Sequence, residues 1–106
     1  MGTSAIIAVE GSDITLYKHF DGYKEGTLPW LQDFNEKFVA NRGNDIPYKI
    51  AQLIRSSFAD ADEYDLDKSR FTGWGVHHRG TDPYLYANFE YTLKKDGSVS
   101  IRNLNS

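Results

Sequence analysis

Apolar residues recur along the chain with two different periods, which separates predicted strands from predicted helices. Ala5–Val9 is a short, continuous apolar run, and Ile14–Phe20 alternates apolar with polar residues. Both patterns are typical of β-strands. The segment Glu10–Asp13 between them is rich in turn-forming residues, so the pattern predicts an N-terminal β-hairpin.

Alternation along the second strand predicts which side chains point to the core. Ile14, Leu16 and Phe20 occupy one set of alternate positions. Tyr17 and His19 occupy the other set and should therefore lie on the opposite face of the sheet.

The first helical pattern follows Asp21-Gly22 and is expected to span Leu28–Ala40. Thr27 is the predicted N-cap, Pro29 falls in the first turn, and Gly43 follows the end of the helix. Its apolar stripe comprises Leu28, Trp30, Leu31, Phe34, Phe38 and Val39, and its water-facing side comprises Gln32, Asp33, Asn35, Glu36 and Lys37.

A second helix is predicted from Ile46 to about Asp60. Asn44 or Asp45 can cap it, and Pro47 again falls in the first turn. Residues at the spacing of one helical face are Ile46, Ile50, Leu53, Ile54 and Phe58.

The last third of the chain predicts three strands, 71–79, 84–94 and 98–104, joined by turns at 80–83 and 95–97. We expect an antiparallel meander. Its core face should comprise Trp74, Val76, Leu85, Ala87, Phe89, Tyr91, Leu93, Val99 and Ile101.

The resulting order, ββααβββ, predicts an α+β fold. We expect a two-layer sandwich in which two helices cover one face of an antiparallel sheet of about five strands. Nothing in the chain repeats, and no linker divides it, so residues 1–106 should form a single domain.

Composition narrows the function classes. The chain has 106 residues, a net charge of −3 and a pI near 5.5, which gives no electrostatic reason to expect direct nucleic-acid binding. The absence of cysteine excludes disulfides and thiolate chemistry. No apolar run approaches the roughly 20 residues of a membrane span. We therefore expect a cytoplasmic protein without membrane contact.

The sheet face that the predicted helices leave uncovered, here called the helix-free face, is the main candidate binding surface. Its predicted members are Tyr17, His19, His77, Arg79, Tyr84, Tyr86 and Glu90. Tyrosine and arginine are enriched in protein interfaces, so this face could contact a partner protein or form a homodimer. The alternative is a solvated face on which tyrosine reflects β-propensity alone.

Histidines near this face allow a catalytic alternative. His19 with Asp21 provides an imidazole and a carboxylate for acid-base chemistry, and His77 lies on a strand that could be adjacent. A zinc site formed by His19, His77 or His78 with Asp21 is a further alternative, but such a site takes three or four ligands, which spacing alone does not show. Since His77 and His78 are consecutive, they should point to opposite faces. We predict no cofactor and no metal.

The segment 60–68 concentrates carboxylates at Asp60, Asp62, Glu63, Asp65 and Asp67. A calcium-binding EF-hand loop is excluded, because Asp65 stands where glycine is required and Phe71 where glutamate is required. The run is either a solvated loop or a patch that mimics a phosphate backbone in the basic groove of a partner.

The segment Leu16-Tyr17-Lys18-His19-Phe20-Asp21-Gly22-Tyr23 resembles a motif of a family of small bacterial and phage proteins that has no assigned activity. In that motif arginine stands at the position of Lys18, and proline at the position of Lys24, before Glu25. The resemblance covers about ten residues. It implies a single α+β domain of mobile-element origin, and it implies no mechanism.

These observations favour a non-enzymatic protein-binding module, such as a phage or prophage accessory or anti-defence protein that binds a host protein. Two alternatives stay open. One is a small metal-dependent or hydrolase-like enzyme centred on His19 and Asp21. The other is a binder of a small anionic or nucleotide-like ligand, held by Tyr17, Arg79, Tyr84 and Tyr86.

Overall fold

The computed structural model describes residues 3–18, 24–57, 74–79 and 87–104. In these ranges the elements are β1 (Ala5–Val9), β2 (Ile14–Lys18), α1 (Lys24–Arg42), α2 (Ile46–Ser57), β3 (Trp74–His78), β4 (Phe89–Leu93) and β5 (Val99–Asn103). The predicted α+β class and ββααβββ order are confirmed.

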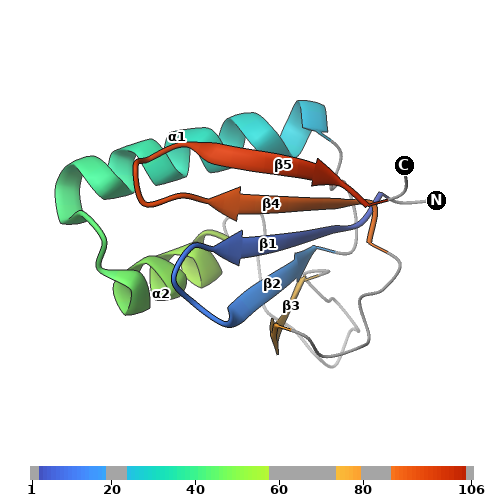
Figure 1. Cartoon of the computed structure of the whole chain (residues 1–106), viewed down its shortest axis with the longest axis horizontal. Helices are drawn as coiled ribbons and strands as arrows, with labels where there is room; N and C mark the ends of the chain where they lie inside the picture. The colour runs from blue at the N-terminus through green and yellow to red at the C-terminus, as the bar shows by residue number, and fades with distance from the viewer. Residues whose placement is uncertain (1–2, 19–23, 58–73, 80–86, 105–106) are drawn as a thin grey trace, which may run out of the picture.

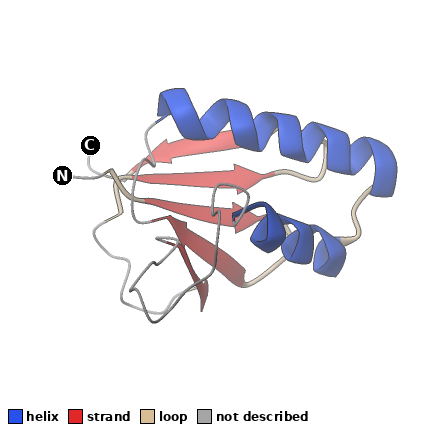
Figure 2. Cartoon of the chain, turned by 180° about the vertical axis from the view of Figure 1, so that it is seen from behind, coloured by secondary structure: helices blue, strands red, loops and turns tan. Residues whose placement is uncertain are grey.

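The five strands form one sheet in the order β3-β2-β1-β4-β5, so β1 is its central strand. Figure 1 shows the sheet in front of the helices, and Figure 2 shows the same molecule from behind, with both helices on the near face. The predicted two-layer arrangement is therefore confirmed, with α1 and α2 on one side of the sheet.

The sheet is mixed, which corrects the prediction of an antiparallel sheet ending in a meander. β1 pairs antiparallel with β2, β2 with β3, and β4 with β5. However, β4 pairs in parallel with β1 and not with β3. A parallel pair needs a long crossover connection, and α1 and α2 lie within the connection from β1 to β4.

Glycine permits the β1–β2 turn. Gly11 has φ 93°, a conformation that side chains disfavour, and the amide of Ser12 donates to the Val9 carbonyl at 3.0 Å. The adjacent Glu10 links this turn to the β4–β5 turn, since its carboxylate accepts a 2.7 Å hydrogen bond from the Lys95 amide.

The β4–β5 turn has the predicted position and composition. Gly97 has φ 96°, as in hairpins with a three-residue loop. The Asp96 carboxylate accepts hydrogen bonds from the Ser98 amide at 2.9 Å and the Ser98 hydroxyl at 2.6 Å. These hydrogen bonds lower the pKa of Asp96.

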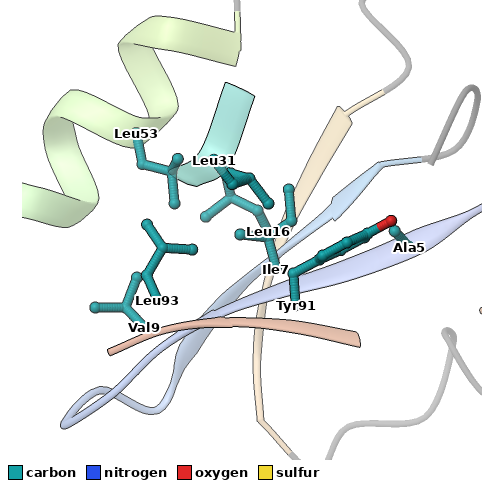
Figure 3. Packing of buried hydrophobic residues seen from close by; sticks show 8 residues of the cluster. All are labelled: Ala5, Ile7, Val9, Leu16, Leu31, Leu53, Tyr91 and Leu93. Carbon is teal, nitrogen blue, oxygen red and sulfur yellow. The ribbon is translucent and has the colours of Figure 1, made fainter. Parts of the chain in front are cut away.

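The core lies between the sheet and the helices. Figure 3 shows its eight central residues, Ala5, Ile7, Val9, Leu16, Leu31, Leu53, Tyr91 and Leu93. Partly buried residues packed against them include Leu28, Trp30, Phe34, Ile46, Ile50, Ile54, Phe89 and Val99. The predicted helix stripes and the β4 face are thus confirmed at these positions.

Edge positions depart from the predicted core. Val76 and Ile101 are 52% and 38% exposed, although their registers place them on the helix side, opposite Leu16 and Tyr91. They belong to β3 and β5, the two edge strands of the described sheet, where each has one neighbour among the described strands. The predicted core residues Phe20, Phe58 and Leu85 lie outside the described residues.

Helix α1 begins at Lys24, about one turn before the predicted start. Thr27, the predicted N-cap, is therefore inside the helix and fully buried. Its side chain is hydrogen bonded to the hydroxyl of Tyr91 in β4. Burial raises the pKa of Tyr91 to about 12, so this hydroxyl stays protonated in the core.

The end of α1 and the start of α2 follow the predicted signals. Gly43, with φ 62°, ends α1 and donates its amide proton to the Val39 carbonyl at 2.9 Å. Asp45 caps α2, where its carboxylate accepts a hydrogen bond from the Tyr48 amide at 3.4 Å.

Asn35 was predicted to face water, and this prediction is wrong. Its side chain is fully buried, and its amide nitrogen donates to the carbonyls of Lys94 and Ser98 at 2.9 and 2.8 Å. Asn35 therefore joins α1 to the end of the β4–β5 hairpin. The helical period alone does not distinguish such a residue from a solvated one.

We expect Asn35→Ala to lower the free energy of unfolding by about 1–3 kcal/mol, because the buried side chain loses its two hydrogen bonds to the hairpin carbonyls. Chemical denaturation measures the change. Gln32→Ala, on the exposed side of the same helix, is the matched control and should change stability by less than about 0.5 kcal/mol. Equal stability of the two variants would contradict a structural role for Asn35.

Lys49 of α2 is fully buried and its Nζ has no hydrogen-bond partner. The nitrogen lies 5.5 Å from the centre of the Phe38 ring. Burial lowers the pKa of Lys49, and the negative charge of Glu10 opposes this effect in part. Among the described residues, the helix layer therefore contains a buried lysine whose ammonium group makes no hydrogen bond.

We expect Lys49→Met to raise the free energy of unfolding near pH 7 by about 1 kcal/mol or more, since it removes a buried charge. An unfolded lysine holds its proton to about pH 10.5, whereas folded Lys49 releases it at lower pH. Wild-type stability should therefore rise with pH relative to the variant, and the difference should shrink as pH approaches 10.5.

Denaturation at a series of pH values tests this prediction. Lys37→Met, at an exposed position of α1, is the control and should show no such pH-dependent difference. A Lys49→Met variant that is less stable than wild type at every pH would show that the ammonium is stabilising where it lies.

Candidate functional site

The structure defines the described part of the helix-free face through the strand registers. Two rows of side chains cross it. The first row is Gly75, Tyr17, Ile6, Glu90 and Arg102, and the second is His77, Thr15, Ala8, Thr92 and Ser100. The rows differ in chemistry, because the first contains the charges and the second is mostly small residues with hydroxyl groups.

The centre of this face is buried, although α1 and α2 both lie on the other side of the sheet. Ala8 and Thr15, both in the second row, are almost completely inaccessible to solvent. Toward the β5 edge, Ser100 and Arg102 are exposed. The face is therefore neither uniformly solvated nor uniformly apolar, and its accessible charged groups lie at its periphery.

His77 contacts Thr15 across the β2–β3 pair. The Thr15 hydroxyl lies 2.9 Å from Nδ1 and 3.0 Å from Nε2 of the imidazole. Burial lowers the pKa of His77, and electrostatic repulsion from Arg79 and His78 lowers it further. His77 is consequently neutral near pH 7 and acts on this face as a hydrogen-bonding group without charge.

Glu90 lies between two arginines. Its Oε1 is 2.9 Å from Nη2 of Arg102, its cross-strand neighbour, and its Oε2 is 3.7 Å from Nη1 of Arg79. The Glu90 side chain is 17% exposed, whereas those of Arg79 and Arg102 are 45% and 69% exposed. The carboxylate is thus partly withdrawn from solvent, and both guanidinium groups remain accessible.

The contact between Arg79 and Glu90 joins two strands that are not neighbours in the twisted sheet. Arg79 follows β3, and strands β2 and β1 separate β3 from β4. In a flat sheet, strands with two others between them are about 14 Å apart. Strand twist accumulates across a sheet, and Figure 1 shows β3 running at a steep angle to β4 and β5. The twist changes the direction of β3 relative to β4, and the long side chains of Arg79 and Glu90 meet on the helix-free face.

The predicted site residues divide into two groups. Tyr17, His77 and Glu90 occupy the helix-free face by register, and Arg79 reaches Glu90 there. His19, Tyr84 and Tyr86 lie outside the described residues, as do Asp21 and the acidic run Asp60, Asp62, Glu63, Asp65 and Asp67. Of the three tyrosines predicted on this face, only Tyr17 therefore lies within the described residues.

Arg102 and Thr15 are members of the face that the sequence analysis did not identify. Arg102 follows Ile101 by one position, so the alternation of β5 was sufficient to place it opposite the core face. Thr15 similarly alternates with Ile14 and Leu16. The alternation was sufficient in both strands, but the predicted face included neither a threonine nor any residue of the strand 98–104.

The described residues also bear on metal binding. His77 and His78 pair with Thr15 and Ile14 respectively, so they lie on opposite faces, as predicted. In the described ranges, no three His, Cys, Asp or Glu side chains come together in a group suited to a metal ion. Neither α1 nor α2, the helices of these ranges, is long and apolar enough to cross a membrane.

Comparisons with protein-family models, curated proteins and solved structures give no match to this chain.

We expect His77 to titrate below pH 6.5, because its surroundings disfavour the imidazolium ion. Arg79→Gln removes one positive charge and should raise this pKa, whereas Arg102→Gln should not. Unfolded histidine titrates near 6.5, so acidification through this value should destabilise the wild type more than His77→Gln. NMR titration of the imidazole protons measures the pKa. A wild-type value above 6.5 would contradict this environment.

Proposed function

We propose that the chain is a non-enzymatic protein-binding module that contacts its partner through the helix-free face. The observation that carries this proposal is the arrangement of Arg79 and Arg102 around Glu90. Two guanidinium groups against one carboxylate leave an excess of positive charge on a chain whose net charge is −3. A local reversal of sign supports binding to an acidic surface.

The geometry leaves hydrogen-bonding capacity for a partner. Each guanidinium has five N–H donors, and the contacts with Glu90 involve one nitrogen of each arginine. Glu90 restrains the two side chains, so less conformational entropy is lost when a partner carboxylate binds them. Arginine and tyrosine are also the residue types that contribute most to interface affinity, and Tyr17 lies in the same row as Arg102.

The alternative functions have less support. An enzyme centred on His19 and Asp21 falls on residues outside the described ranges. In those ranges, burial and the side chains of Arg79 and His78 lower the pKa of His77, and no carboxylate is among these causes. A ligand site built from Tyr84 and Tyr86 also falls outside the described ranges. A cytoplasmic location and an accessory role in phage or prophage biology, with a host protein as the partner, belong to this proposal. The second of these depends on the short motif resemblance.

Charge reversal tests the proposal. The double variant Arg79→Glu, Arg102→Glu should retain at most about one tenth of the partner that immobilised wild-type protein captures from bacterial lysate. Lys37→Glu, an equal charge change on the outer side of α1, should capture as much as wild type. Quantitative mass spectrometry compares the three proteins, and thermal unfolding confirms that each is folded.

Equal capture by all three proteins, or no protein specific to the wild type, would contradict the proposal. Light scattering on the purified protein measures its mass and so tests whether this face binds a second copy of the chain. If the wild type is a dimer and the double variant a monomer, the partner of this face is a second copy of the chain.

A further inference from the structure

Strand β5 is an edge of the sheet, and its hydrogen-bonding pattern identifies which backbone groups point outward. The amide of Lys94 donates to the Ser98 carbonyl at 2.8 Å, and that of Leu104 donates to the Asn88 carbonyl at 2.8 Å. In an antiparallel pair, hydrogen-bonded and non-hydrogen-bonded positions alternate. Ser100 and Arg102 therefore bond to β4, and the N–H and C=O groups of Val99 and Ile101 face away from the sheet.

The side chains of β5 are also accessible, and the two sides differ in chemistry. Ile101 is 38% exposed on the helix side, beside Tyr91. The Arg102 side chain is 69% exposed on the helix-free face, beside Glu90. One step along the strand thus changes the exposed group from an apolar side chain to a cation.

This edge has little of the protection that isolated edge strands usually have. Proteins block such edges with proline, bulges, or several charged residues. Strand β5 contains no proline, its five pairs with β4 are in continuous register, and Arg102 is its single charged residue. The exposed backbone can therefore accept another strand.

We infer that β5 binds an extended segment of the partner as an additional strand, in which apolar residues alternate with acidic ones. The backbone of the segment pairs with Val99 and Ile101. Its apolar side chains lie beside Ile101, and its acidic side chains lie beside Arg102 on the helix-free face. This inference rests on the proposed function and specifies the chemistry of the partner.

A second copy of β5 fits this edge less well. If two β5 strands paired antiparallel with Ile101 opposite its own copy, the two Arg102 side chains would be diagonal neighbours on one face. Diagonal neighbours are about 7–8 Å apart, within reach of long side chains, and like charges at this distance repel. A register shifted by two residues would place the arginines directly opposite each other. Charge complementarity therefore favours an acidic segment over self-association.

Two synthetic peptides of about nine residues, sufficient for one strand, test the inference. One alternates valine with glutamate and the other alternates valine with lysine. In NMR titrations the glutamate peptide should shift the amide signals of Val99 and Ile101 and bind roughly tenfold more tightly than the lysine peptide. Arg102→Glu should reverse this preference.

A pair of substitutions at one position tests the backbone contact separately. Ile101→Pro removes an outward N–H group without removing a hydrogen bond to β4, and it should abolish binding of the glutamate peptide. Ile101→Thr also loses the apolar side chain but keeps the N–H group, so it should retain measurable binding. Amide spectra of both variants confirm that the fold is intact.

The inference is overturned if neither peptide shifts the β5 signals, if both bind equally, or if Ile101→Pro binds as well as wild type. Concentration-dependent self-association through β5 would also overturn it. These outcomes leave the proposed function standing if charge reversal at Arg79 and Arg102 still abolishes capture of a partner. If that capture is also unchanged, both proposals are wrong.

Discussion

Burial of β1 on both faces is the constraint on which the rest of the structure depends. β1 lies between β2 and β4, and four of its five residues are buried. A strand with polar residues on one face could not occupy this position, because these groups would lose water without gaining partners. β4 pairs with β1 in parallel, and the long connection that this pairing requires contains α1 and α2, which lie on one face of the sheet.

Two buried polar side chains mark where the helix layer meets the ends of the strands. Asn35 provides both of its donors to backbone carbonyls of the β4–β5 hairpin, and so fixes the position of α1 relative to that hairpin. Lys49 lies in the other helix, without a hydrogen-bond partner. An apolar side chain in place of Asn35 would bury a similar area but would not fix the position of α1 relative to the hairpin, because apolar contacts have no preferred direction. Asn35 therefore contributes specificity of packing, whereas Lys49 is a group whose burial opposes stability.

Much of the fold was accessible from the sequence because it depends on local periodicity. Period-two alternation gave the faces of β2 and β4, and the helical period gave the buried stripe with Leu31 and Leu53. Strand pairing is not local. The apolar run Ala5–Val9 was read as one arm of a hairpin, although a strand without polar positions is typical of burial on both faces beside a parallel neighbour. Taken further, this signal would have predicted the mixed sheet.

The candidate site was accessible only in part, for a related reason. Alternation placed Tyr17, His77 and Glu90 on the helix-free face, but no local pattern indicates that Arg79 contacts Glu90 there. The strand order also determines that β5 is an edge, and hence that Ile101 is exposed although its register faces the core side. A residue selected as core from its period thus becomes part of the proposed binding edge.

A sheet built around β1 leaves the outward backbone groups of β5 available to a partner. Native-state hydrogen exchange of the purified protein tests this claim most directly. We predict that amides of β1 exchange only through global unfolding, and that β5 alternates, with slow exchange at Ser100 and Arg102 and fast exchange at Val99 and Ile101. Slow exchange at all four β5 positions would show that this edge is already paired and would contradict the account.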